Sequence, residues 1–123
     1  MLDLGCGVGF DACVAARLAG PEGRVVGVDI TPGMVTRAWE FSMVLPFRNL
    51  SFQVASAEKL PFPPQFFDVV ISNGVLNLVI DKDKAAEEIF RVLKPSGHLL
   101  LADMVLVAPL PPERENLIEN WYQ

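Results

Sequence analysis

The sequence is poor in cysteine and in positive charge, and it has no long apolar run. Two cysteines in 123 residues are too few for a disulfide scaffold, and Cys6 and Cys13 do not have metal-ligand spacing. We therefore expect a reducing, cytoplasmic location and no metal site. Ten Lys and Arg against fifteen Asp and Glu form no basic run, which argues against a nucleic-acid partner. No apolar stretch reaches the ~18 residues of a membrane helix and no secretory signal is visible, so no membrane association is expected.

The composition is that of a globular protein with one core. Hydrophobic residues make up 51% of the chain and charged residues 20%, which excludes a disordered chain. The length corresponds to one domain, so residues 1–123 are interpreted as a single unit.

Apolar runs alternate with helix-like stretches, which is typical of an α/β protein with a parallel sheet. Strands are predicted at residues 1–4, 24–30, 50–54, 67–72 and 99–106. We expect Asp11, Thr31 and Asp81 to cap the helices that follow them, a turn at residues 95–97, and a last polar helix at residues 113–122.

Right-handed crossovers make 3-2-1-4-5 the expected strand order. Ligands of such sheets bind beyond the carboxyl ends of the strands, where the order reverses. That point is predicted between the first and fourth strands.

A glycine-rich segment, Asp3-Leu4-Gly5-Cys6-Gly7-Val8-Gly9, follows the first predicted strand and precedes the first helix. Gly5 and Gly7 would let a ligand approach the backbone closely, and the helix after them offers free N–H groups. Asp3 could orient this loop or accept from a ligand ammonium. The alternative is an ordinary strand-to-helix turn that happens to be rich in glycine.

Asp29 ends the second predicted strand, where a carboxylate can accept both hydroxyls of a ribose. The alternative is a helix cap beside Thr31. Together with the glycine loop, Asp29 indicates a nucleoside-type ligand. A dinucleotide fingerprint would carry its third glycine one residue later than Gly9, and we expect Phe10 to sit where that helix packs on the strand. An NAD-linked oxidoreductase is therefore disfavoured but left open.

Five segments resemble, in order, the motifs of class I S-adenosylmethionine (SAM)-dependent methyltransferases: residues 3–9, 27–29, 57–62, 67–70 and 91–97. The resemblance implies a three-layer Rossmann-like sandwich and SAM as the cofactor. It also implies a small-molecule methyl acceptor. Methyl transfer from a sulfonium mainly requires positioning and exclusion of water, so no catalytic residue is assigned.

The resemblance also implies which residues of this chain contact the cofactor. The glycine loop and Asp3 would meet the methionine part, Asp29 the ribose, and Asn73 the sulfonium side, with Gly74 beside it. Many relatives carry Asp where this chain has Ser56. The full predicted set is Asp3, Gly5, Gly7, Asp29, Ile30, Met34, Ser56, Ala57, Glu58 and Asn73.

Residues 9–11, 27–32, 71–78 and 101–104 resemble arsenite methyltransferases more closely. Trivalent arsenic binds thiolates, and that subfamily usually carries cysteines at the positions of Ala12 and Gly74. Because neither residue is Cys, another small-molecule acceptor is the main expectation. Asp103, at the end of the fifth predicted strand, could face the acceptor or could be a polar strand terminus. The only histidine, His98, is expected at the other end of that strand.

The family's usual N-terminal helices and last two strands have no counterpart in this sequence. We therefore expect an incomplete SAM-binding core whose fifth strand is an exposed apolar edge. Such an edge favours pairing with another chain, for example in a homodimer. A SAM-binding module without catalytic activity is the alternative function.

Overall fold

The computed structural model describes residues 1–109, so the helix predicted at residues 113–122 lies outside the described residues. Five parallel strands form one sheet in the order β3-β2-β1-β4-β5, as predicted. The strands are β1 (Leu2–Leu4), β2 (Val25–Asp29), β3 (Leu50–Val54), β4 (Phe67–Asn73) and β5 (Leu93–Ala102). The helices are α1 (Phe10–Ala19), α2 (Pro32–Met43), the single 3-10 turn η1 (Leu76–Leu78) and α3 (Lys82–Val92).

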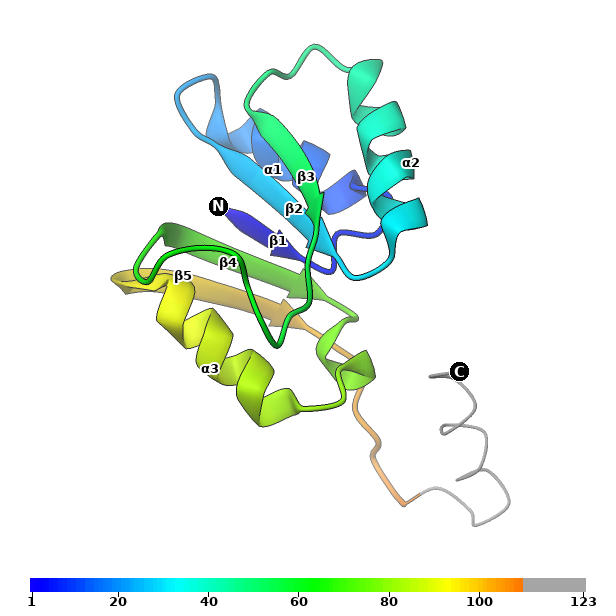
Figure 1. Ribbon diagram of the computed structural model, residues 1–123, viewed down its shortest axis with the longest axis vertical. Coiled ribbons are helices and arrows are strands. Elements are labelled where there is room, and N and C mark those ends of the chain that lie inside the picture. Colours follow the sequence, from blue (N-terminus) through cyan, green and yellow to red (C-terminus); the bar gives the residue numbers. More distant parts are fainter. Residues whose placement is uncertain (110–123) are drawn as a thin grey trace.

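The helices cover both faces of the sheet, which confirms the three-layer α/β sandwich (Figure 1). Helices α1 and α2 pack on the half formed by β1, β2 and β3, and α3 packs on the opposite face near β5. Two apolar cores result. One joins α1 and α2 to the sheet and includes Ala12, Ala38 and Phe52, and the other joins α3 to the sheet and includes Leu4, Val70 and Ile89. Because both faces of β1 are covered, all three of its residues are buried, Asp3 included, and burial does not alternate along the strand.

One of the three predicted helix caps is wrong, and a second is a cap by position without a side-chain hydrogen bond. Helix α1 begins at Phe10 with Gly9 as its N-cap, and Asp11 lies in the first turn, so the prediction that Asp11 caps this helix is wrong. Thr31 is the N-cap of α2, but its side chain makes no capping hydrogen bond to the described residues. The Asp81 side chain accepts from the backbone N–H of Lys84 at 3.0 Å and caps α3 as expected.

The predicted position of Phe10 is also wrong. Its side chain is 63% exposed, because the first residue of α1 points away from the sheet. The steric argument against a dinucleotide therefore does not hold in this fold.

Strand β5 begins six residues before the predicted strand and ends four residues before its predicted end. The expected turn at residues 95–97 is absorbed as an irregularity within the strand: Phe67 pairs with Leu93, and Val69 already pairs with His98. Lys94 Nζ lies 2.9 Å from Asp68 Oδ1 across this irregularity. Pairing with β4 on both sides thus keeps residues 95–97 within the strand, although their local sequence is typical of a turn.

Strand β5 forms one edge of the sheet (Figure 1), and its leucine side chains are exposed to solvent. Leu99, Leu100 and Leu101 are 43%, 58% and 50% exposed. The sheet therefore has the uncovered apolar edge that the sequence predicts.

Candidate functional site

The glycine loop lies at the carboxyl end of β1, between the strand and α1. Gly5 has φ +68° and Gly7 has φ +53°, which glycine adopts without strain. A Cβ at Gly5 would stand 2.2 Å from Val75 Cγ2, so the segment after β4 packs directly on this loop. At Gly7, no atom of residues 1–109 lies within 4 Å of the place a Cβ would occupy. The Gly7 backbone is therefore open to a ligand.

Asp29 connects the end of β2 to the glycine loop. Its Oδ2 accepts from the backbone N–H of Gly7 at 2.9 Å, and its Oδ1 accepts from the N–H of Thr31 at 2.9 Å. The contact with Thr31 is in line with the cap role that was the alternative for Asp29, and the hold on the glycine loop is a contact the sequence did not predict. Each carboxylate oxygen can accept a second hydrogen bond, so capacity remains for ligand hydroxyls.

Asp3 is a buried carboxyl with an unsatisfied oxygen. It is 2% exposed, and its Oδ2 has no hydrogen-bond partner in the described part of the chain. Burial, and after it the nearby Asp11, raise its pKa to about 7, although the hydrogen bond from the backbone N–H of Ala12 opposes the shift. A buried carboxyl of this kind is costly unless a ligand uses it.

A cavity of about 330 Å³ adjoins Asp3 at the carboxyl ends of β1, β4 and β5. Asn73 Nδ2 donates to Asp11 Oδ2 at 3.2 Å, which links the end of β4 to the first turn of α1. The remaining lining residues are Ile71, Ser72, Leu100, Leu101 and Ala102. One end of the cavity is therefore acidic and polar, and its wall along β5 is apolar.

The other predicted site residues lie at the ends of β2 and β3. Ile30 is 69% exposed and Met34 is 37% exposed, which leaves apolar surface beside Asp29 for a planar ring. Ala57 packs against the core under α3. The other two have internal partners, because Ser56 Oγ accepts from the N–H of Glu58 and Glu58 Oε1 accepts from the N–H of Asp81, each at 3.2 Å.

The structure also shows contacts that sequence reasoning missed. Val75 against Gly5 and the Asn73–Asp11 pair join residues far apart in the chain. The loop before β4 is held to α3 by Arg91, which donates to the carbonyl oxygens of Phe62 (2.7 Å) and Leu60 (3.0 Å). No local pattern marks these pairs, because sequence periodicity reports the face of an element and not its distant neighbours.

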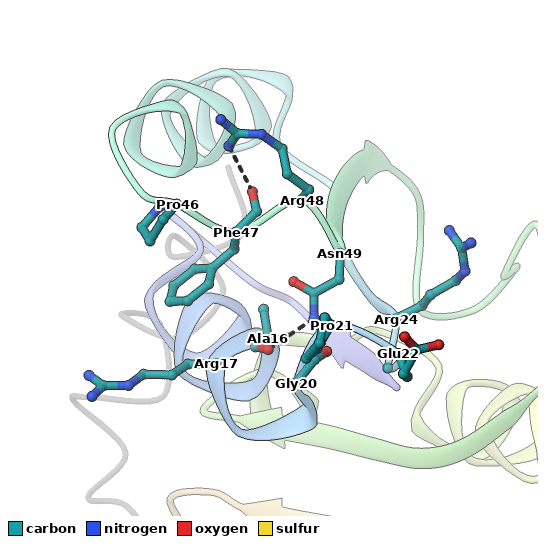
Figure 2. Close-up of a pocket in the computed structure, with 11 residues that line it drawn as sticks. Ala16, Arg17, Gly20, Pro21, Glu22, Arg24, Pro46, Phe47, Arg48 and Asn49 are labelled. Carbon is teal, nitrogen blue, oxygen red and sulfur yellow. Dashed lines mark hydrogen bonds between the residues drawn. The ribbon is translucent and has the colours of Figure 1, made fainter.

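A larger cavity, about 460 Å³, lies at the opposite end of the sheet, before β2 and β3 (Figure 2). Its central polar group, the Asn49 amide, donates to the carbonyl oxygens of Ala16 (2.9 Å) and Gly20 (2.8 Å). Figure 2 shows the guanidinium groups of Arg17, Arg24 and Arg48 pointing away from one another. The polar groups that line this cavity do not converge on a common point where a ligand could bind. The Asn49 amide instead ties the segment before β3 to the end of α1.

Both cysteines are buried and poorly suited to ligate a metal or metalloid. Burial raises the pKa of the Cys6 thiol to about 12, and burial also raises the pKa of Cys13. Within residues 1–109 no group of three or more His, Cys, Asp or Glu side chains could hold a metal ion. None of the helices in this part of the chain has the length and apolar character of a membrane span.

A profile of the methyltransferase domain matches residues 1–123, the whole chain. The chain belongs to the methyltransferase domain family. It is 40% identical over 113 residues to an arsenite methyltransferase of Halobacterium salinarum, which covers 92% of this chain and 29% of that protein. It is 43% identical over 117 residues to a ubiquinone/menaquinone biosynthesis C-methyltransferase of Serratia proteamaculans, covering 89% of this chain and 45% of that protein.

Its fold is similar to the crystal structure of an arsenic(III) S-adenosylmethionine methyltransferase from Chlamydomonas reinhardtii, with a TM-score of 0.83 and 36% identity. That match covers 94% of this chain and 42% of the other. The family and its cofactor, SAM, are thereby confirmed as predicted. The chain spans less than half the length of these three relatives.

Proposed function

We propose that this chain binds SAM at the carboxyl ends of β1, β2 and β4, as the cofactor-binding core of an enzyme that methylates a small molecule. The link between Asp29 and Gly7 carries this proposal. It holds a carboxylate, which can accept from ribose hydroxyls, beside a glycine backbone that leaves space for the polar tail of the cofactor.

The residues of the site fit the cofactor part by part. Asp29 has free acceptor capacity for two ribose hydroxyls, and Ile30 and Met34 present apolar surface for the adenine. The unsatisfied Oδ2 of Asp3 would accept from the ammonium of the methionine part. When bound, SAM supplies an activated methyl group. The chain's contribution is to orient the cofactor and the acceptor and to exclude water.

The acceptor we favour is a small organic molecule. The proteins similar to this chain include arsenite and quinone-pathway methyltransferases, so likeness alone leaves both chemistries open. Arsenic(III) requires thiolates, and Ala12 and Gly74 occupy the positions expected to carry them. Burial and the neighbouring carboxylates Asp3 and Asp29 hold the Cys6 thiol in its protonated form, which further disfavours arsenite.

Calorimetric titration with SAM and S-adenosylhomocysteine, with NADH in parallel, tests the proposed site. We expect micromolar binding of both SAM-type ligands and no binding of NADH. Binding of NADH alone would favour the oxidoreductase alternative. A folded sample that binds none of the three would contradict the assignment for this chain.

A SAM-binding core without catalytic activity is the alternative function. It is favoured by the uncovered wall of β5, since the chain provides no covering for an acceptor there within residues 1–109. Binding of SAM without turnover over a panel of phenols, quinols, amines and arsenite would support this alternative. Methylation of any panel member would exclude it.

We also propose that the chain self-associates through the β5 edge. Three consecutive leucines lie on β5, whose outer edge pairs with no other strand of residues 1–109, so both apolar surface and backbone groups face a second chain.

A further inference from the structure

A short segment after β4 links the glycine loop to the end of β5. Strand β4 ends at Asn73, Gly74 turns the chain with φ +69°, and η1 follows. The side chain of Val75 lies directly on Gly5. The residues 74–78, here called the β4 segment, therefore form one wall of the predicted methionine side of the site.

A single turn of 3-10 helix is not stable by itself, so other contacts must hold the β4 segment in place. The backbone N–H of Gly74 donates to the carbonyl oxygen of Ala102 at 2.8 Å, which extends the β4–β5 pairing by one residue. Leu76 packs against the core beneath α3. These contacts fix the residues before and after Val75. The turn that follows is held by polar groups.

Asp103, the first residue after β5, provides those polar contacts. Its Oδ2 accepts from the backbone N–H of Asn77 at 3.1 Å, and its Oδ1 accepts from the N–H of Met104 at 2.8 Å. With the Asn77 amide oriented to satisfy both neighbours, Asn77 Nδ2 donates to Asp103 Oδ1 (2.9 Å) and to the carbonyl oxygen of Gly74 (3.1 Å). One half-buried carboxylate thus ties the whole β4 segment to β5.

We propose that Asp103 is a positioning residue, which holds Val75 against the glycine loop through Asn77 and so shapes the methionine side of the cofactor site. The inference rests on the proposed function. Asp103 accepts from the N–H groups of Asn77 and Met104, and we assign its effect on the ligand to the β4 segment. This role is additional to the two expected of it from the sequence, which were facing the acceptor or ending a strand.

The test compares two ligands that differ only in the part near the β4 segment. S-adenosylhomocysteine carries the amino-acid tail, and 5′-methylthioadenosine has the same adenine and ribose without it. In Asp103→Ala we expect S-adenosylhomocysteine to bind about tenfold more weakly, the equivalent of one lost hydrogen bond to a charged group. The affinity for 5′-methylthioadenosine is expected to change less than about threefold. Asp83→Ala, in the exposed first turn of α3, is the matched control and should leave both affinities unchanged.

A second pair of variants covers the case in which Asp103→Ala does not fold. Asn77→Asp places two carboxylates against each other. It should weaken the binding of S-adenosylhomocysteine more than that of 5′-methylthioadenosine. Combining it with Asp103→Asn restores an amide facing a carboxylate in the reverse order, and at least half of the lost affinity, on a logarithmic scale, should return.

Several outcomes would overturn the inference. Unchanged affinity for S-adenosylhomocysteine in a folded Asp103→Ala, or equal losses for both ligands, would show that Asp103 does not act on the methionine side. If the double variant does not regain affinity, Asp103 does not affect ligand binding through its contact with Asn77. If the wild-type chain binds neither ligand, the proposed function itself fails. If the wild type binds both ligands and Asp103→Ala binds them with the same affinities, only the inference about Asp103 fails.

Discussion

At the scale of single residues, Asp29 carries the proposed cofactor site because one carboxylate serves both the fold and the ligand. Asp29→Ala removes acceptors for the N–H groups of Gly7 and Thr31 and for the ribose hydroxyls. We expect S-adenosylhomocysteine binding to weaken by roughly 2–4 kcal/mol, as measured by calorimetry. Asp83→Ala is the control. Wild-type affinity in a folded Asp29→Ala would refute the placement of the site.

Asp3 links stability to pH. Its ordinary pKa is 3.8 and burial raises it to about 7 in the folded chain. Between these values the folded chain holds a proton that the unfolded chain has released. The carboxyl's contribution to stability is therefore complete below pH 3.8 and is lost as the pH rises through 7.

Asp3→Asn removes this titration and keeps the shape of the side chain. We expect the variant to be more stable than the wild type at pH 8, by an amount on the order of a few kcal/mol, and the difference to shrink as the pH falls toward 4. Thermal unfolding at several pH values measures this. A variant that is destabilised equally at every pH would contradict it. The same substitution should weaken the binding of S-adenosylhomocysteine, since the proposed role of the buried Asp3 carboxyl is to contact the ligand.

At the scale of elements, Glu88 on α3 holds the loop that precedes β4. Its Oε2 accepts from the N–H of Leu60 at 2.7 Å, and its Oε1 pairs with Arg91, which itself donates to the loop. The Arg91 guanidinium keeps the pKa of Glu88 below its usual range. Stability from this carboxylate is therefore present above its unfolded pKa and is lost as the pH falls through the lower folded value.

Glu88→Ala is expected to destabilise the chain by about 1–3 kcal/mol at pH 7, because the Leu60 N–H loses its partner. Urea unfolding followed by circular dichroism measures the change. Glu87→Ala, next to it on the exposed side of α3, is the matched control and should change stability by less than about 0.5 kcal/mol. Equal effects of the two substitutions would show that the loop contact does not contribute.

At the scale of the whole molecule, the proposed association depends on the edge at β5, which is exposed in the described part of the chain. We expect the apparent mass to rise with concentration in size-exclusion chromatography with light scattering. Leu100→Lys places a charge on the exposed edge, where Leu100 is 58% exposed, and should reduce association without loss of secondary structure. Leu18→Lys, on the outer face of α1 and 81% exposed, is the control and should leave association unchanged. A clean monomer at the highest concentration would contradict the proposal.

Much of the architecture was predictable because it follows from local pattern. Continuous apolar runs identified the buried parallel strands, and the glycine loop and Asp29 stood at the right ends of them. Errors arose where neighbours outweighed local preference. Residues 95–97 favour a turn, yet the β4–β5 ladder draws them into a strand, and Gly9 replaces Asp11 as the cap of α1 because the loop enters that helix in the left-handed conformation.

The sequence by itself determined the class of fold, the order of the strands and the type of ligand, because periodicity, glycine and chain position are local properties. Only the tertiary structure decided which polar groups are satisfied. Within residues 1–109 it left a buried oxygen of Asp3 without a hydrogen-bond partner, paired Asn73 with Asp11, and set the Asp103 carboxylate against the N–H of Asn77. The two pairings join residues 62 and 26 positions apart in the chain, and burial and distance between such residues exist only once the chain is folded.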